Sequence, residues 1–175
     1  MAGADRSCLG AGAPVALSRC YLDTNFIYAH LRARRGATLG PVETWRAQVL
    51  SEVDDGGGVI SALVLDELAY RLVLAWLRDD GDHDPLSTYR ADAGTVMRSA
   101  RRRLTAIWRA VDSLALELQP TEHAVVQRAK SLMAQPGLSP RDAFHAAHAL
   151  EAGCDLIASS DTGFDQVSKL RRVAP

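Results

Sequence analysis

Short apolar segments alternate with longer stretches of helical periodicity along most of the chain. In the longer stretches, apolar residues recur every three or four positions, as at Leu65, Leu68 and Leu72, which is typical of helices that bury one face. Short apolar runs between such helices are typical of buried strands. The alternation predicts an α/β domain with a mostly parallel sheet. The predicted strands span residues 19–22, 59–61, 114–118 and 155–159.

Glycine, proline and clusters of polar residues separate the predicted helices. Residues 79–87 are interpreted as a polar loop, and residues 166–173 as a weak terminal element. Residues 1–14 are rich in glycine and alanine, so we expect a disordered lead-in ahead of one domain over 15–175, with a helical hairpin insertion around 79–111. The predicted helices span residues 24–34, 42–53, 62–78, 88–111, 120–134 and 139–152.

Acidic residues stand where two of the predicted strands end. Asp23 comes directly after segment 19–22, and Asp161 comes just after segment 155–159. In open parallel sheets, ligands bind outside the carboxyl ends of the strands. Several carboxylates gathered there repel one another unless they share a divalent cation, and Mg²⁺ or Mn²⁺ accepts carboxylate oxygens. The candidate ligands are Asp23, Glu67, Asp142 and Asp161.

Each of these acids also has a local explanation. Asp23 precedes a predicted helix and fits its N-cap or the end of a tight turn. Glu67 is spaced to pair with Arg71 on a solvated helix face. Asp142 follows a serine at capping-box spacing, and Asp161 suits a turn. Spacing alone leaves both interpretations open.

Four motifs contain these acids and follow one another in a recognisable order. They are Tyr-Leu-Asp-Thr-Asn at 21–25, Leu-Asp-Glu-Leu-Ala at 65–69, Ser-Pro-Arg-Asp-Ala-Phe-His-Ala-Ala at 139–147 and Ile-Ala-Ser-Ser-Asp-Thr-Gly-Phe-Asp at 157–165. In this order, and on matching strand and helix types, the motifs resemble the PIN-domain nuclease family, most closely the VapC-type toxin ribonucleases. The resemblance runs from residue 19 to residue 173.

This resemblance carries expectations about fold, activity and partners. It implies a three-layer α/β/α fold around the central sheet, cleavage of RNA with Mg²⁺ or Mn²⁺, a cognate antitoxin and a homodimer. The positions that match the family's catalytic and metal-binding acids are Asp23, Glu67, Asp142 and Asp161. Supporting positions match Asn25, Ser159 and Asp165, where Ser159 replaces a threonine that the family often has.

Carboxylates of this kind support a phosphodiesterase mechanism. We expect them to hold one or two divalent ions that activate a water molecule for in-line attack on the phosphorus atom. The products would carry a 5′-phosphate and a 3′-hydroxyl group. This mechanism needs no histidine as base. We interpret His145 and His148, in an alanine-rich helix, as residues that pack or form a hydrogen bond on the helix face, and not as metal ligands.

Charge is nearly balanced in total but uneven in kind. The net charge of −1 excludes a polybasic protein that holds nucleic acid by bulk charge. The chain has 18 arginines but only 2 lysines, and arginine suits phosphate. A solvated helix face and an acidic partner, such as an antitoxin tail, are alternative explanations for the arginines of segment 88–111. Those that share one helical arc, and are therefore candidate RNA-binding residues, are Arg98, Arg101, Arg102 and Arg109.

Several other classes of protein fit the sequence poorly. Residues 1–14 lack the apolar centre of a signal peptide, and no apolar run approaches the ~18 residues of a membrane span. The three cysteines form no C-x-x-C pair. We therefore expect a cytoplasmic protein that does not contact membranes. Two alternatives stay open within the resemblance: an RNA-processing PIN endonuclease without an antitoxin, and a noncatalytic nucleic-acid-binding PIN-like module.

Overall fold

A five-stranded sheet forms the centre of the computed structural model, which describes residues 19–33, 40–53 and 57–175. The strands are β1 (Cys20–Leu22), β2 (Gly58–Ser61), β3 (Glu117–Gln119), β4 (Leu156–Ala158) and β5 (Arg171–Val173). They follow the order β3-β2-β1-β4-β5, and every neighbouring pair is parallel. The predicted parallel sheet is therefore confirmed. The predicted lead-in over residues 1–14 lies outside the described residues.

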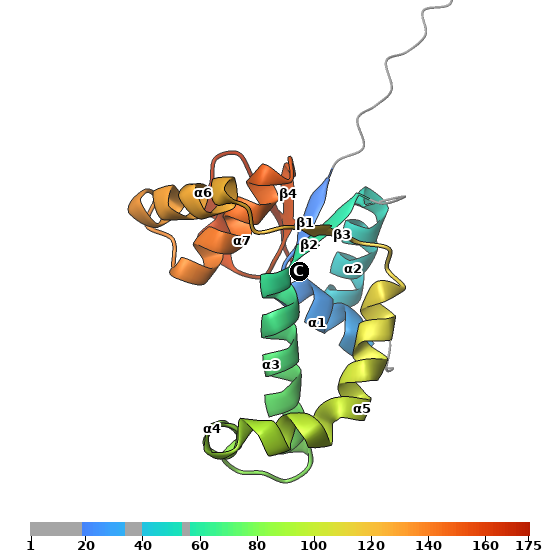
Figure 1. Cartoon of the computed structure of the whole chain (residues 1–175). Helices are drawn as coiled ribbons and strands as arrows, with labels where there is room; N and C mark the ends of the chain where they lie inside the picture. The colour runs from blue at the N-terminus through green and yellow to red at the C-terminus, as the bar shows by residue number, and fades with distance from the viewer. Residues whose placement is uncertain (1–18, 34–39, 54–56) are drawn as a thin grey trace, which may run out of the picture.

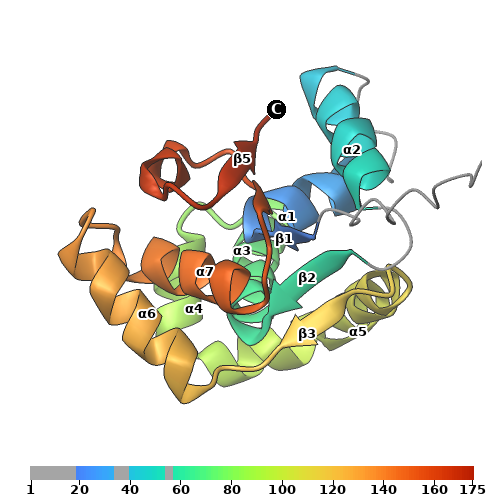
Figure 2. The same cartoon turned by 90° about the horizontal axis from the view of Figure 1, so that it is seen from above.

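Helices cover both faces of this sheet. They are α1 (Thr24–Ala33), α2 (Pro41–Glu52), α3 (Ala62–Asp79), α4 (Pro85–Ala91), α5 (Ala93–Asp112), α6 (His123–Ala134), α7 (Pro140–Glu151) and the 3₁₀ helix η1 (Thr162–Gln166). α7 packs against β1, β2 and β4, and α6 packs against α7. Figure 2 shows α6 and α7 on one side of the sheet and α2 on the other. The indole N–H of Trp45 on α2 donates to the carbonyl of Val173 in β5 (2.8 Å).

α3 and α5 form a helical hairpin that extends away from the sheet, with α4 at its far end (Figure 1). Arg103 on α5 makes two hydrogen bonds to Asp80 (2.9 and 3.0 Å), and its guanidinium lies over the ring of Trp76. Neither these helices nor any other helix of the described residues has the length and apolarity to cross a membrane. The residues that α5 buries recur every three or four positions: Val96, Ala100, Leu104, Ile107 and Val111.

The prediction of one long helix over 88–111 is wrong. The structure has two helices there, separated at Asp92, and α4 begins inside the predicted loop 79–87. Asp92 has the non-helical dihedral angles φ −152° and ψ 77°, and its side chain accepts a hydrogen bond from the backbone N–H of Thr95 (2.9 Å). Short acidic side chains compete with the helix for backbone donors. Asp92 therefore ends α4 and caps the start of α5.

The register of the sheet brings the ends of β1 and β4 together. Leu22 pairs with Ala158, so the residues that follow them, Asp23 and Ser159, lie next to each other. The backbone N–H of Asp23 continues this contact by donating to the carbonyl of Ala158 (3.2 Å). Ser61 ends β2 on the other side of β1 and leads directly into α3. The carboxyl ends of three adjacent strands thus define one edge of the sheet.

Candidate metal centre

Asp23 is the buried centre of the candidate site, with 4% of its surface exposed. Its Oδ2 accepts hydrogen bonds from the Ser159 hydroxyl (2.6 Å) and the Asn25 side-chain amide (3.0 Å). Its Oδ1 accepts a hydrogen bond from the backbone N–H of Thr24 (2.7 Å). A buried carboxylate is costly unless donors or cations satisfy it. Three donors do so here, and they fix the orientation of both carboxylate oxygens.

Glu67 reaches toward Asp23 from the second turn of α3. Its Oε2 accepts a hydrogen bond from the Thr24 hydroxyl (2.9 Å), and its Oε1 lies 3.1 Å from Nε of Arg141 on α7. The sequence spacing suggested Arg71 as the ion-pair partner of Glu67. Arg71 instead donates to the side-chain oxygen of Asn25 (2.6 Å). The side chain of Glu67 is only 11% exposed. The interpretation of Glu67 as a residue of a solvated helix face is therefore wrong.

His145 approaches the two acids from α7. Its Nε2 lies 3.3 Å from Oε2 of Glu67 and 3.7 Å from Oδ1 of Asp23. The three residues each offer one potential ligand atom, and these atoms lie within 4.8 Å of one another. Burial on its own would raise the pKa of Glu67, but the hydrogen bond and charge of His145, with help from Thr24 and Arg141, lower it below its usual value.

His145 packs and forms a hydrogen bond, as interpreted from the sequence, but it also faces the two acids. The ring is buried and meets Tyr21 edge-on, at 5.8 Å between centroids, as a packing residue does. Its Nδ1, however, lies 2.9 Å from the Tyr21 hydroxyl, which in turn lies 2.7 Å from the hydroxyl of Ser61. Burial raises the pKa of Tyr21, so its phenol stays protonated. This pair of hydroxyls holds the imidazole with Nε2 directed at the carboxylates.

Asp142 and Asp161 lie beside each other at Gly163. A Cβ atom on Gly163 would lie 3.2 Å from Oδ1 of Asp161 and 3.8 Å from Oδ2 of Asp142. The hydroxyl of Ser159 joins this pair to Asp23, because it accepts a hydrogen bond from the backbone N–H of Asp161 (3.0 Å) while donating to Asp23. Of the described residues, the group with ligand atoms within 4.8 Å of each other contains Asp23, Glu67 and His145, and not this second pair.

The local roles foreseen for these two acids are also present. The hydroxyl of Ser139 donates to Oδ2 of Asp142 (2.6 Å) and accepts from its backbone N–H (3.4 Å), which is the predicted cap of α7. Oδ1 of Asp161 accepts from the backbone N–H of Gly163 (2.8 Å). Asp23 and Asp142 stand at the N-termini of α1 and α7, where the helix dipole favours negative charge. Local capping and assembly of the site are therefore compatible.

Asp165, predicted as a supporting residue, forms an ion pair. Nε and Nη2 of Arg172 each lie 2.8 Å from one of its carboxylate oxygens. The hydrogen bonds from Arg172 lower the pKa of Asp165. Nη1 of Arg172 also approaches the backbone carbonyl of Ser159 (3.5 Å). The pair therefore joins η1 and β5 next to the site, and it gives Asp165 a partner other than the carboxylate group.

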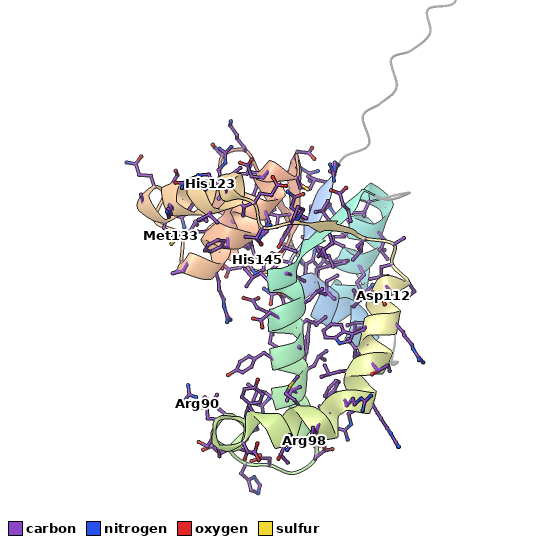
Figure 3. The ribbon with its side chains drawn as sticks, in the orientation of Figure 1. Arg90, Arg98, Asp112, His123, Met133 and His145 are labelled. Atoms are coloured by element: carbon purple, nitrogen blue, oxygen red, sulfur yellow. The ribbon has the colours of Figure 1, made fainter. Side chains whose placement is uncertain are left out.

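The four candidate RNA-binding arginines all lie on α5. Their side chains are exposed on α5. Figure 3 shows Arg98 near the far end of the hairpin, whereas His145 lies near the sheet. Arg98 donates to the hydroxyl of Thr95 (2.7 Å), on its own helix. The structure does not bring Arg98 into the acidic site, so the binding role of this set, with Arg101, Arg102 and Arg109, stays a prediction.

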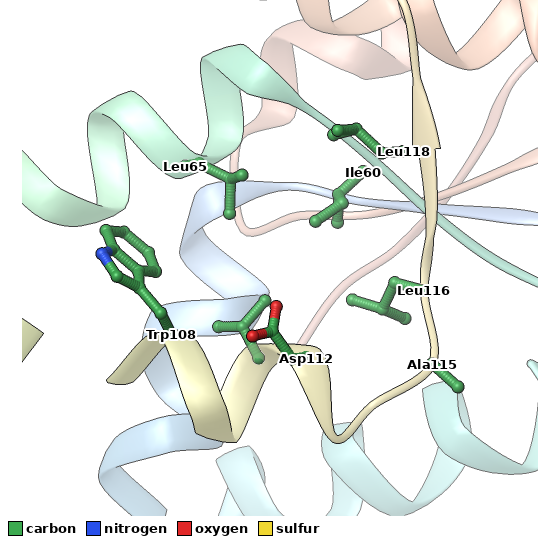
Figure 4. A pocket seen from close by; sticks show the side chains of 8 residues that line it. Ile60, Leu65, Trp108, Asp112, Ala115, Leu116 and Leu118 are labelled. Carbon is green, nitrogen blue, oxygen red and sulfur yellow. The ribbon is translucent and has the colours of Figure 1, made fainter. Parts of the chain in front are cut away.

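A cavity of about 470 Å³ lies at the base of the hairpin, between β2, β3, α3 and α5. Figure 4 shows Leu65 and Trp108 on the helices, and Ile60 and Leu118 on the strands, around it. Of the described residues that line the cavity, Asp112 is the one that carries a charge. Phosphate or metal chemistry needs several polar groups, so this apolar cavity is separate from the candidate site.

The donor set of the acidic site fits a divalent cation. Carboxylate oxygens are ligands that Mg²⁺ and Mn²⁺ accept, and an imidazole nitrogen adds a preference for the transition metal. Asp23, Glu67 and His145 are close enough to share one ion. Asp142 and Asp161 offer further carboxylates on the side of Ser159. This set can also orient a phosphate group through a bound cation.

Comparisons with known proteins agree with this architecture. The structure is similar to VapC20 of Mycobacterium tuberculosis, described as a sarcin–ricin loop cleaving toxin, with 14% identity, coverage of 89% of this chain and 99% of that chain, and a TM-score of 0.54. It is also similar to VapBC2 of Rickettsia felis bound to a promoter DNA fragment, with 15% identity, coverage of 87% and 96%, and a TM-score of 0.50. At these identities, the likeness shows a shared fold.

The comparison of the sequence with family models identifies the same fold. A search of curated proteins finds no match. The model of the PIN domain matches residues 20–170, which include strands β1 to β4 and every acid of the candidate site. The three-layer α/β/α fold predicted from the resemblance is thereby confirmed. Because the match covers most of the chain, this protein belongs to the PIN domain family.

Proposed function

We propose that this protein is a metal-dependent endoribonuclease that hydrolyses RNA phosphodiester bonds as the toxin of a toxin–antitoxin pair. The observation that supports this most directly is the convergence of Asp23, Glu67 and His145 within 4.8 Å at the carboxyl edge of a PIN-domain sheet. Burying a carboxylate costs solvation energy. A cation held between these carboxylates and a phosphate group would offset that cost.

The proposed roles of the residues follow from their positions. The catalytic and metal-binding acids are Asp23, Glu67, Asp142 and Asp161. A bound Mg²⁺ or Mn²⁺ ion supplies a Lewis acid that polarises the phosphoryl oxygens and activates water. Ser159 and Asn25 hold Asp23 in place. Arg141 lies against Glu67 with its side chain 62% exposed, so its guanidinium can orient a phosphate oxygen of the substrate.

The proposed partners rest on the likeness to toxin–antitoxin proteins. VapC20 of Mycobacterium tuberculosis is described as a toxin, and its fold is similar over 89% of this chain. We propose that this chain is likewise a toxin, pairs with a cognate antitoxin, forms a homodimer and acts in the cytoplasm. Expression alone should then arrest growth, and co-expression of a small DNA-binding protein encoded next to it should relieve the arrest. An RNA-processing endonuclease without an antitoxin would show no such relief.

The decisive experiment is an RNA cleavage assay with purified protein. Cleavage should need Mn²⁺ or Mg²⁺, stop on addition of a chelator, and leave 5′-phosphate ends. Asp23→Asn should remove most of the activity while circular dichroism shows an unchanged fold, because the amide retains shape but not charge. Asp112→Asn, a matched change at the apolar cavity, should leave cleavage intact. Specific RNA binding without any cleavage would instead support the noncatalytic module.

A further inference from the structure

A second cavity, of about 450 Å³, adjoins the acidic site. It lies between the start of α3 and α7, and Thr121, in the segment between β3 and α6, also lines it. His148 is buried at this cavity, with its Nε2 3.3 Å from the hydroxyl of Thr121. The other residues on which the argument depends are Leu63, Asp66, Pro140, Arg141 and Phe144.

Arg141 connects this cavity to the acidic site. Its side chain lines the cavity, while its Nε lies 3.1 Å from Oε1 of Glu67. On α3, Asp66 lines the cavity and the next residue, Glu67, belongs to the acidic site. A substrate with a phosphate at Asp23 and Glu67 therefore has the cavity within reach of its neighbouring nucleotide.

The walls of the cavity suit a flat ring with a polar edge. Leu63, Pro140 and Phe144 provide apolar surface, while Asp66 and Thr121 provide a carboxylate and a hydroxyl. The negative charge of Asp66 disfavours a phosphate inside the cavity, whereas Arg141 attracts one at its mouth. Proteins that recognise single-stranded RNA stack unpaired bases on aromatic rings and read their edges by hydrogen bonds. The volume lies in the range of single-ligand pockets, roughly 300–1,000 Å³.

We propose that this cavity holds an unpaired nucleobase next to the scissile phosphate, and that Asp66 selects guanine. Guanine has two neighbouring N–H donors, N1–H and the 2-amino group, which match the two oxygens of one carboxylate. Adenine and cytosine offer an amino group beside a ring acceptor, which a carboxylate repels, and uracil offers one N–H between two carbonyl groups. Phe144 supplies the stacking surface. This inference rests on the proposed function, because it assigns a specificity pocket to the same reaction.

The test varies one base in short single-stranded RNA and uses two readouts. In the Asp23→Asn variant of the full chain, fluorescence anisotropy measures binding without cleavage; in the wild type, kcat and KM are measured. A series of oligoadenosines carries one guanosine, each at a different position. At one position beside the cut, the guanosine should lower KM by about tenfold, as expected for a bidentate contact. Inosine at that position, which lacks the 2-amino group, should lose most of the gain. Asp66→Asn should remove the preference for guanosine.

Matched variants distinguish base recognition in the cavity from general effects of substitution on folding or RNA binding. Asp112→Asn, the same change at the apolar cavity, should keep the preference for guanosine. Phe144→Leu retains apolar volume but loses the ring, and should weaken RNA binding at every base. A guanosine preference that survives Asp66→Asn, or the absence of any base preference, would overturn the proposal. So would a loss of self-association in Phe144→Leu with unchanged RNA binding, since a second copy would then cover the cavity.

Failure of the proposed function gives a different result. In that case no RNA is cleaved with Mn²⁺ or Mg²⁺ by any variant, whatever base occupies the test position. The anisotropy measurement still tests the pocket under those conditions, because it needs no turnover. Guanosine-selective binding that depends on Asp66, without cleavage, would support the pocket and contradict the nuclease.

Discussion

Nε2 of His145 on α7 lies 3.3 Å from Oε2 of Glu67 on α3. Imidazole is a better ligand for transition metals than for Mg²⁺, which prefers oxygen. We therefore expect His145→Ala to weaken Mn²⁺ binding by about 10- to 100-fold and to affect Mg²⁺ much less. Electron paramagnetic resonance of free Mn²⁺ measures the affinity, and ¹⁴N couplings of the bound ion report the imidazole directly.

His123→Ala, on the exposed start of α6, is the matched control and should leave the Mn²⁺ affinity unchanged. Equal losses of Mn²⁺ and Mg²⁺ affinity in His145→Ala, without a ¹⁴N coupling in the wild type, would assign His145 a purely structural role.

Asp161 and Asp165 are four residues apart but have different surroundings. Asp161 lies beside Asp142 at Gly163, whereas Asp165 is paired with Arg172. We expect Asp161→Asn to reduce the cleavage rate by about 100-fold or more, and Asp165→Asn to keep a rate close to that of the wild type while lowering the melting temperature slightly. Cleavage assays and thermal melts of both variants check this. If both variants lose activity equally, Asp165 acts with the catalytic acids and not only as the partner of Arg172.

His148 should make the stability of the fold depend on pH. Burial, and secondarily the nearby His145, lower the pKa of His148 from 6.5 to about 4. Between these values the unfolded chain binds more protons than the folded one, so the free energy of unfolding falls as the pH decreases from 6.5 toward 4. The expected loss from this residue is about 2 kcal/mol after allowance for solvent screening. Urea titrations at several pH values measure it.

His148→Gln should flatten this pH dependence, because glutamine can still contact Thr121 but does not titrate. His123→Gln, at an exposed position, should keep the dependence of the wild type. If both variants follow the wild-type curve, the acid sensitivity comes from other groups.

The arginines of α5 are expected to be dispensable for cleavage of short RNA. Figure 3 shows Arg98 near the far end of the hairpin and His145 near the sheet, so we expect a short oligonucleotide bound at the acids not to contact Arg98. Arg98→Glu with Arg102→Glu should therefore leave kcat/KM unchanged, whereas Arg141→Glu, at the side of Glu67, should reduce it strongly. A large loss in the double variant would support the RNA-binding interpretation of this face.

The sheet and one pair of site residues were predictable from local patterns. Short apolar runs marked four of the five strands, whereas β5 lies in the segment predicted only as a weak terminal element. The rule for carboxyl ends of parallel strands placed Asp23 correctly. The register then brought Ser159 to Asp23, as the family motifs had suggested. The helix break at Asp92 was missed, because apolar periodicity continues across it while the interruption depends on one side chain and its bond to Thr95.

Contacts between distant segments were less predictable. The role of His145 depends on its contacts with Tyr21 at Nδ1 and with Glu67 at Nε2. These three residues lie on three separate elements, α7, β1 and α3. The one local signal was its position three residues after Asp142, on the same side of the helix. The ion pair of Asp165 with Arg172 depends on how η1 turns back to β5, and spacing along the chain does not encode that path.

The hydrogen bonds around Asp23 have a thermodynamic consequence for ligand binding. Ser159, Asn25 and the backbone of Thr24 already hold the carboxylate in one orientation. A side chain fixed in this way has little conformational entropy left to lose when a cation binds. The conformational entropy of the Asp23 side chain is lost when β1 and β4 come together during folding. Cation affinity is therefore linked to the integrity of the sheet, and conditions that loosen the contact between these strands weaken binding before the chain unfolds.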